Sequence, residues 1–283
     1  MLKLSTRGLT ALFAATAMPA FAADIYEPVP EAPAQVVYEE VSTGGWYLRG
    51  DIDYHWSKFR GADYITYGVG PGPAPLPGTN SFDFGDLKGA MSLGAGVGYQ
   101  INNHLRTDLT ADYWFKSDFR GQTSDLTTIS TDTSSYSALL LLANAYVELG
   151  TYKRITPYIG AGIGGARVKW GDLRNQFPGV DDRHEGAKNW RFAYALMAGA
   201  SYCLNRNLHL DAGYRYTRIN GGRMFHYADS SAGGPGAGPG FDKGFDVHEV
   251  RAGLRYQFGA GKSDCGEPEV IAYEPPPVEP VYK

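Results

Sequence analysis

The sequence predicts an all-β protein whose central part is an eight-stranded antiparallel transmembrane β-barrel. Three observations predict it: apolar and polar residues alternate over eight segments, short and long connections alternate between those segments, and aromatic residues gather near the segment ends. A period of two indicates a strand with two different faces. In a membrane barrel the apolar face meets lipid and the polar face looks into the lumen. A soluble sandwich is the alternative, but nothing in its architecture requires connection lengths to alternate.

The first 22 residues show the three-part pattern of a secretory signal peptide. Lys3 and Arg7 form a basic start, residues 9–17 an apolar stretch, and residues 20–22 read Ala-Phe-Ala, a small-residue cleavage site. We expect cleavage between residues 22 and 23. Residues 23–44 hold three prolines and five acids without Lys or Arg, which predicts a disordered but extended periplasmic arm.

Residues 45–258 contain the eight expected strands. The last shows the alternation most clearly, because Val250, Ala252, Leu254, Tyr256 and Phe258 share one face and Arg251, Gly253, Arg255 and Gln257 share the other. No run of about 18 apolar residues follows the N-terminus, so we expect no membrane-spanning helix. The expected strands cover residues 46–57, 89–101, 105–116, 136–149, 155–168, 189–204, 208–218 and 250–258.

The connections between these strands alternate strictly in length. Three are short (102–104, 150–154 and 205–207) and four are long (58–88, 118–135, 170–188 and 219–244). Membrane barrels have tight periplasmic turns and long outside loops. The long connections are therefore expected to be four exposed surface loops, and the glycine-rich one at 219–244 is expected to be too flexible for a catalytic site. Outward aromatic residues mark the expected outer rim (Trp56, Phe115, Trp190, Tyr216) and inner rim (Trp46, Tyr99, Tyr202, Phe258).

The polar strand faces carry equal numbers of acids and bases. An eight-stranded barrel is only wide enough for side chains to fill, and an unpaired charge there costs several kcal/mol. We therefore expect an ion-paired, filled lumen and no wide pore, with Gly94, Gly96, Gly98, Gly160, Gly162 and Gly164 making room. A narrow or gated channel is the competing interpretation. The lumen acids are Asp51, Asp53, Asp108, Asp112, Glu148, Asp211 and Glu249, and the bases are Arg49, Arg106, Lys116, Arg191, Arg215, Arg251 and Arg255.

Four segments together resemble the porin-family eight-stranded outer-membrane barrels of alphaproteobacteria, which are related in fold to OmpA/OmpX-type barrels. They are the acidic proline-rich arm, the run Gly-Trp-Tyr-Leu-Arg-Gly at 45–50, the run Thr-Pro-Tyr-Ile-Gly-Ala-Gly-Ile-Gly at 156–164, and the run Gly-Leu-Arg-Tyr-Gln-Phe at 253–258. The resemblance implies an outer-membrane location. It also implies that Gly253, Tyr256 and Phe258 form the assembly signal read by the barrel-assembly machinery.

The resemblance further implies a covalent link to peptidoglycan. The mature N-terminal Ala23 would attack the acyl-enzyme of an L,D-transpeptidase through its free α-amine. The chain departs from the family pattern by continuing beyond Phe258 with a proline-rich tail, residues 259–283. This periplasmic tail is expected to be an unstructured linker, and a contact with peptidoglycan or a periplasmic partner is the alternative.

The two cysteines lie near the same expected end of the barrel. Cys203 is at the periplasmic end of the sixth strand, on its lumen side, and Cys265 lies seven residues past Phe258. The periplasm is oxidising. A Cys203–Cys265 disulfide that folds the tail under the barrel is therefore our hypothesis, and two free thiols are its alternative.

The sequence points to a structural role. The net charge of −4 leaves no basic stripe for nucleic acid, and the six histidines show no metal-ligand spacing, so no cofactor is expected. Asp181-Asp182-Arg183-His184 superficially suggests a protease, but one loop cannot supply both halves of such a site, so we expect no enzyme. We expect an envelope-stabilising barrel in contact with outer-membrane lipid and lipopolysaccharide; a narrow porin or a surface ligand-binding protein is the alternative.

Overall fold

The computed structural model describes residues 44–67, 78–124, 129–228, 237–258 and 265. The chain divides into one unit of residues 38–269 and a second of residues 1–37 with 270–283, and every described residue belongs to the first. The expected signal peptide, Ala23, the arm up to residue 43 and the tail apart from Cys265 lie outside the described residues. Within the described residues, no helix is long and apolar enough to cross a membrane.

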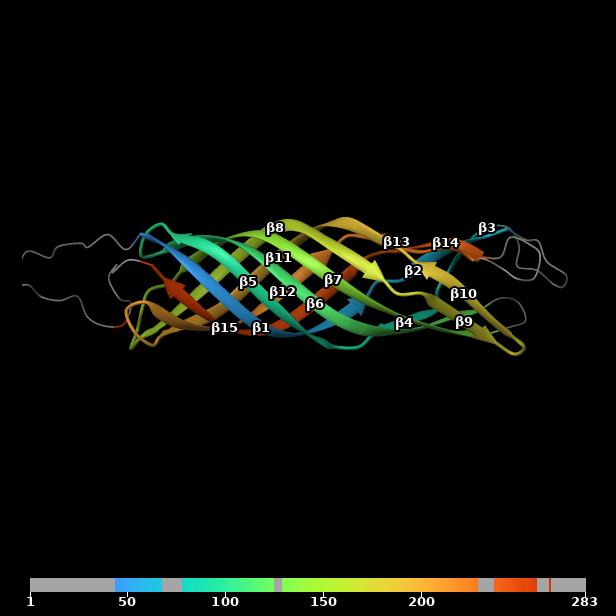
Figure 1. Ribbon diagram of the computed structural model, residues 1–283, viewed down its shortest axis with the longest axis horizontal. Coiled ribbons are helices and arrows are strands. Elements are labelled where there is room, and N and C mark those ends of the chain that lie inside the picture. The colour runs from blue at the N-terminus through green and yellow to red at the C-terminus, as the bar shows by residue number, and fades with distance from the viewer. Residues whose placement is uncertain (1–43, 68–77, 125–128, 229–236, 259–264, 266–283) are drawn as a thin grey trace, which may run out of the picture. The chain divides into compact units, whose positions relative to one another are not determined.

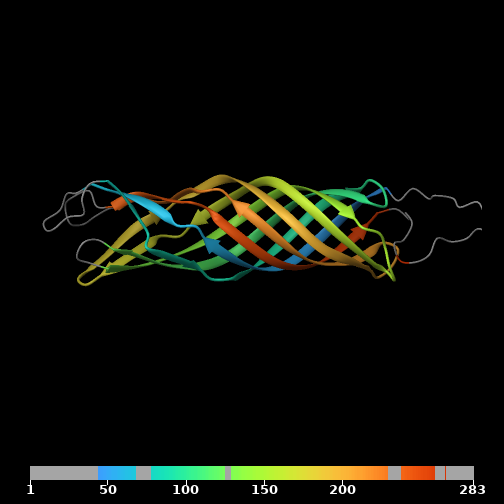
Figure 2. The same ribbon diagram turned by 180° about the vertical axis from the view of Figure 1, so that it is seen from behind.

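Eight long strands form a continuous circuit of antiparallel pairs (Figure 1). Each pairs with the next long strand along the chain. Because β1 pairs with both β5 and β15, the circuit returns to its first strand. Figures 1 and 2 show these strands running obliquely side by side. The eight are β1 (Gly45–Phe59), β5 (Ala90–Gln100), β6 (Leu105–Ser124), β7 (Ile129–Glu148), β8 (Ile155–Trp170), β11 (Lys188–Cys203), β12 (Leu208–Ile219) and β15 (Phe245–Gln257).

Seven shorter strands occupy three of the four connections that were expected to be loops, and the far ends of β6 and β7 extend into the fourth, 118–135. The described residues thus hold fifteen strands, seven more than the eight that were expected. Residues 117–135 are rich in Ser, Thr and Asp, so both faces of a strand there are polar and hydrophobic alternation gives no signal. The seven are β2 (Ala62–Thr66), β3 (Gly78–Ser81), β4 (Phe84–Leu87), β9 (Leu173–Phe177), β10 (Val180–Gly186), β13 (Gly222–Ala228) and β14 (Ala237–Asp242).

The short strands join the far ends of β6 and β7 in a second circuit of pairs. Its order is β6, β7, β9, β10, β13, β14, β2, β3, and β4 then pairs with β6. Segment 78–87 closes the circuit, because Phe82 N donates to Ala62 O and Asp83 N donates to Gln122 O, each at 2.9 Å. We call these seven strands with the far ends of β6 and β7 the strand extension, which lies at one end of the long strands (Figures 1 and 2).

The long strands reverse the usual placement of polar and apolar side chains. Leu48, Ile52, Leu109 and Ile163 are half or more exposed on the outer face, whereas the residues between them face a closely packed interior. A bulge between Trp114 and Ser117 shifts the alternation on β6. Lys116 is therefore exposed on the outside, and its expected place among the lumen bases is wrong, because the extra residue of a bulge reverses every later side chain.

Candidate functional site

The interior of the long strands contains a dense network of charges. All thirteen interior residues expected as the charge network are at most 6% exposed. They come from six of the long strands, so the network crosses the interior from several sides. The thirteen are Arg49, Asp51, Asp53, Arg106, Asp108, Asp112, Glu148, Arg191, Asp211, Arg215, Glu249, Arg251 and Arg255.

Two arginines at the middle of the interior each lie between carboxylates. Arg215 Nε is 2.5 Å from Glu249 Oε2, and Arg215 Nη1 is 2.9 Å from Asp112 Oδ2. Arg251 Nη2 is 3.0 Å from Asp51 Oδ2 on the neighbouring strand and 3.7 Å from Asp112 Oδ1 on β6. The guanidinium fork suits two carboxylates at once, so each arginine ties together strands that lie apart in the circuit.

The same arrangement continues toward the end with the short connections. Arg49 contacts Asp51 at 2.7 Å and Asp108 at 3.1 Å, and Arg255 Nε lies 3.3 Å from Asp211 Oδ2. Asp53 lies within 4.0 Å of both central arginines. Every acid of the expected network therefore has an arginine as an ion-pair partner.

Arg106 is held by tyrosine rings as well as by a carboxylate. Its Nε is 2.9 Å from Glu148 Oε1, and its guanidinium carbon lies 4.0 Å from the Tyr146 ring centroid and 4.8 Å from that of Tyr158. A Cβ at Gly160 would collide with the Tyr146 ring, which is the role expected for the interior glycines. The interior is thus filled by side chains at this end.

An aromatic cluster fills the interior near the strand extension. We call it the aromatic cap: Phe59, Trp114, Phe119, Tyr136, Trp170 and Phe245. Ring centroids lie 5.3 Å apart for Tyr136 and Phe245, and 5.5 Å apart for Phe119 and Trp170. Apart from the half-buried Phe59, its members are at most 2% exposed. The sequence pattern did not predict this cap, although Trp114 has the strand parity of an interior residue.

Asp242 is an interior acid that the sequence pattern did not predict. Asp242 Oδ1 and Oδ2 lie 2.6 and 2.8 Å from the two terminal nitrogens of Arg191, and Trp170 Nε1 donates to the same carboxylate at 3.0 Å. Connection 219–244 was expected to be flexible, yet its described residues include β13 and β14 and are anchored by this buried pair. The sequence did not signal this partner, because the register that places Arg191 opposite the uncharged Ala166 on β8 is known only from the structure.

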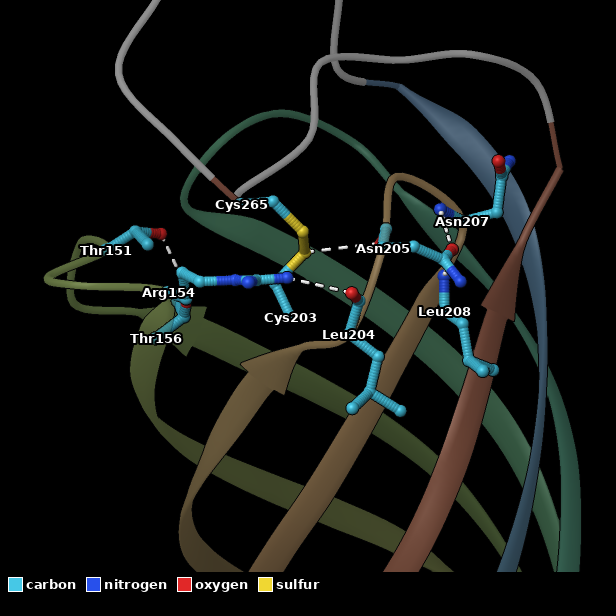
Figure 3. The surroundings of a disulfide bond; sticks show 9 residues. All are labelled: Thr151, Arg154, Thr156, Cys203, Leu204, Asn205, Asn207, Leu208 and Cys265. Atoms are coloured by element: carbon cyan, nitrogen blue, oxygen red, sulfur yellow. Dashed lines mark hydrogen bonds between the residues drawn. A yellow bond between two sulfur atoms is a disulfide. The ribbon is translucent and has the colours of Figure 1, made fainter.

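The two cysteines are joined where β11 ends (Figure 3). Cys203 is 1% exposed, and the Cα atoms of Cys203 and Cys265 are 5.2 Å apart, which is usual for a disulfide. The turn beside it is well defined, since Asn205 Oδ1 accepts from the backbone N–H groups of Asn207 and Leu208, each at 3.0 Å. The bond therefore ties chain beyond β15 back to β11.

The residues expected to form an assembly signal lie on both faces of the last strand. Tyr256 and Phe258 point outward, each 48% exposed, with ring centroids 5.2 Å apart. Gly253 faces the interior, where a Cβ would collide with the Asp51 carboxylate. Packing alone therefore requires glycine at 253, while the outward aromatic pair is free to contact lipid or another protein.

Residues 181–184 do not converge as a protease-like set. Asp181 pairs with Arg174 at 2.7 Å on an exposed face, and Arg183 pairs with Asp172. His184 points to the opposite face, is 4% exposed and lies against the Phe225 ring, with centroids 4.9 Å apart. Burial lowers its pKa. Among the described residues, no group of three or more His, Cys, Asp or Glu is placed to hold a metal ion.

Known proteins share this sequence pattern. Residues 8–258 match the family described as outer membrane protein beta-barrel domain. An uncharacterized protein of Brucella abortus is 38% identical over 262 residues, which cover 83% of this chain and 89% of that protein. The 31 kDa outer-membrane immunogenic protein of Brucella melitensis is 26% identical over 88% of this chain and 97% of its own.

Solved structures of outer-membrane barrels are also similar. OprG from Pseudomonas aeruginosa aligns over 76% of this chain and 97% of its own, with a TM-score of 0.45 and 15% identity. The family match alone extends over most of the chain, including every long strand. This chain therefore belongs to the outer membrane protein beta-barrel domain family, and it is a protein of the outer membrane.

Proposed function

We propose that the eight long strands form a closed OmpA/OmpX-type barrel that crosses the outer membrane and stabilises the envelope without conducting solutes. The strand registers support a closed barrel. Following directly paired residues once around the circuit leads from Trp56 to Trp46, a shift of 56 − 46 = 10 residues. Ten residues of stagger over eight strands correspond to a strand tilt of about 40° and a backbone radius of about 8 Å.

The filled interior is the observation that carries the proposal. A backbone radius of about 8 Å leaves a space that large side chains can fill. Ion-paired arginines occupy the middle and the short-connection end, and the aromatic cap occupies the other end. Opening a path for solutes would break buried ion pairs, and leaving one buried charge unpaired costs about 3–5 kcal/mol.

Single-channel recording tests the proposal against a narrow porin. The purified full-length protein is inserted into planar lipid bilayers, with a known open porin as positive control. Insertion is checked by the difference in gel mobility between unheated and heated samples. We expect no steady conductance above the bare bilayer. Steady openings of uniform size in the nanosiemens range would contradict a sealed barrel.

A second candidate is binding of a surface ligand by the strand extension. The extension consists of paired strands rather than irregular loops, so it could present a fixed recognition surface. Tyr67 and Tyr227 are 40% and 42% exposed, with ring centroids 5.6 Å apart. Exposed paired tyrosines are frequent in recognition surfaces. Bacteria carrying Tyr67→Ser with Tyr227→Ser would then adhere less to host cells than wild type, while equal adhesion would remove this candidate.

We also propose that Ala23 is the attachment point to peptidoglycan. The Ala-Asp start of the expected mature chain supports this, together with the family resemblance. Sacculi digested with a muramidase should release muropeptides that carry the peptide Ala23-Asp24-Ile25. A sacculus preparation from which boiling in detergent removes all of the protein would contradict the attachment and leave the sealed-barrel proposal untouched.

A further inference from the structure

The outer faces of β8 and β11 change from uncharged to positively charged near the strand extension. Alternate residues from Ile155 to Gly165 on β8, and from Tyr202 to Phe192 on β11, are uncharged. The next outward positions on the two strands are Arg167 and Lys169 on β8, and Trp190 and Lys188 on β11. We call Arg167, Lys169 and Lys188 the basic patch.

The strand register places these cations side by side. Lys169 pairs directly with Lys188, and Arg167 pairs with Trp190. Side chains of directly paired residues lie on the same face with Cβ atoms about 5 Å apart, and like charges so placed destabilise the strand pair. The chain therefore concentrates positive charge at one place on its outer surface.

No carboxylate of the described residues forms an ion pair with these cations. All three patch residues are exposed, and within the described residues none of them forms an ion pair. Other exposed cations of the extension do have partners, such as Lys243 with Asp63 at 3.0 Å and Arg174 with Asp181 at 2.7 Å. An external anion is the remaining means of compensating the patch.

The position of the basic patch relative to the membrane surface indicates which anion it binds. The outward ring of Trp190 is 56% exposed and that of Phe192 is 54% exposed, and aromatic rings of this kind mark the boundary between hydrocarbon and head groups. Lys188 lies two residues beyond Trp190, or about 7 Å further along the strand. A charged lipid presents its phosphate groups at this level, directly above its acyl chains.

We propose that the basic patch binds the phosphate groups of the outer-leaflet glycolipid, the lipid A part of lipopolysaccharide. A phosphate between Lys169 and Lys188 turns their mutual repulsion into two attractions. The planar guanidinium of Arg167 can hold two phosphate oxygens at once, and Trp190 lies beside the uppermost part of an acyl chain. This proposal takes one point from the proposed function, namely that the barrel is oriented with the strand extension on the outer side of the outer membrane.

Lipid binding by matched charge variants tests the proposal. Wild type, the patch variant Lys169→Gln with Lys188→Gln, and the control Lys58→Gln with Lys116→Gln are placed in nanodiscs. The control removes the same charge from exposed lysines on β1 and β6. Bound lipid is measured by mass spectrometry with lipopolysaccharide, with the same lipid after phosphatase treatment, and with phosphatidylglycerol.

We expect the patch variant to bind intact lipopolysaccharide about 30-fold more weakly than wild type, since each lysine near an anionic lipid contributes about 1 kcal/mol. The control should bind within about twofold of wild type, and phosphatase treatment should abolish the difference. Equal binding by the patch and control variants would overturn the proposal, as would equal affinity of wild type for phosphatidylglycerol. Folding is verified by heat-modifiable gel mobility. Because none of these readouts depends on conductance, a conducting barrel would refute only the sealed-barrel proposal.

Discussion

Arg191 on β11 and Asp242 on β14 form a two-pronged ion pair whose side chains are 1% and 0% exposed. The pair fixes a strand of the extension onto a long strand, and the indole N–H of Trp170 donates to the same carboxylate. A buried arginine that loses its acid is an uncompensated charge. Asp242 therefore neutralises the buried Arg191 and, together with backbone hydrogen bonds such as Asn220 N to Phe192 O, attaches this connection to the long strands.

Removing that carboxylate should destabilise the protein strongly. We expect Asp242→Ala to lower the free energy of unfolding by about 3–5 kcal/mol, measured by urea unfolding in lipid vesicles. The matched control is Asp181→Ala, which breaks the exposed pair with Arg174 and should cost less than about 1 kcal/mol. Similar losses for both variants would show that the Arg191 pair is not buried in the folded protein. The double variant Arg191→Met with Asp242→Leu should recover much of the stability.

The Cys203–Cys265 disulfide predicts the thiol content of the native protein. Unreduced protein unfolded in urea should take up no maleimide reagent, and reduced protein should take up two equivalents. Closing a loop with a sequence separation of 62 residues stabilises the folded state by up to about 4 kcal/mol in the chain-entropy description. Reduction of the disulfide, or Cys265→Ser, should therefore lower the free energy of unfolding by up to about 4 kcal/mol. Two reactive thiols without reductant would contradict the bond.

The sequence alone supports the long strands well and the strand extension poorly. Alternation of residues such as Asp51, Ile52 and Asp53 fixes which side chains face the interior, because a strand has only two faces. The arginines and acids of the interior could then be named, although their individual partners could not. Partners depend on register, and register is set by the whole circuit of pairs.

Two features of the structure could not be predicted from the pattern of polar and apolar residues in the sequence. The segment around Thr131 carries polar residues on both faces, so its strand in the extension has no hydrophobic alternation. The bulge after Trp114 adds one residue to β6, and nothing in the residue types of Phe115, Lys116 and Ser117 indicates where it lies. Only the pairing partner across the sheet reveals that the faces have exchanged.

The bulge makes opposite predictions for two adjacent residues. Lys116 is exposed, so Lys116→Ala should change the free energy of unfolding by less than about 0.5 kcal/mol. Ser117 is 1% exposed, so Ser117→Lys would bury an unpaired charge and cost about 3 kcal/mol or more. Urea unfolding in vesicles measures both. If the alternation continued without a bulge, the order of the two effects would be reversed.

The strand extension should lose stability in mild acid through His184. Its imidazole is buried against Phe225 and its Nδ1 has no hydrogen-bond partner among the described residues, so burial lowers its pKa below the ordinary value of 6.5. A hydrogen bond to the His226 backbone and, to a lesser extent, the charge of Asp182 oppose this lowering of the pKa without cancelling it. Well above pH 6.5, His184 is neutral in both the folded and the unfolded state, so its titration does not change the free energy of unfolding. Below that pH the unfolded state takes up a proton that the folded state does not, so stability falls as the pH is lowered.

The expected fall is at most about 1.4 kcal/mol per pH unit, between pH 6.5 and the lowered pKa of the folded state. Hydrogen exchange of the β10 backbone amides at pH 7.5 and pH 5.5, corrected for the intrinsic exchange rate, measures it. His184→Gln should remove most of the difference because glutamine does not titrate, whereas the exposed His104→Gln should leave it unchanged. An acid-induced loss that persists in His184→Gln would assign the effect to a group other than His184. The buried Asp132 is not such a group. Burial raises the pKa of Asp132, which has the opposite sign: its protonation favours the folded state as the pH falls. The two groups can therefore be told apart by the direction in which stability moves.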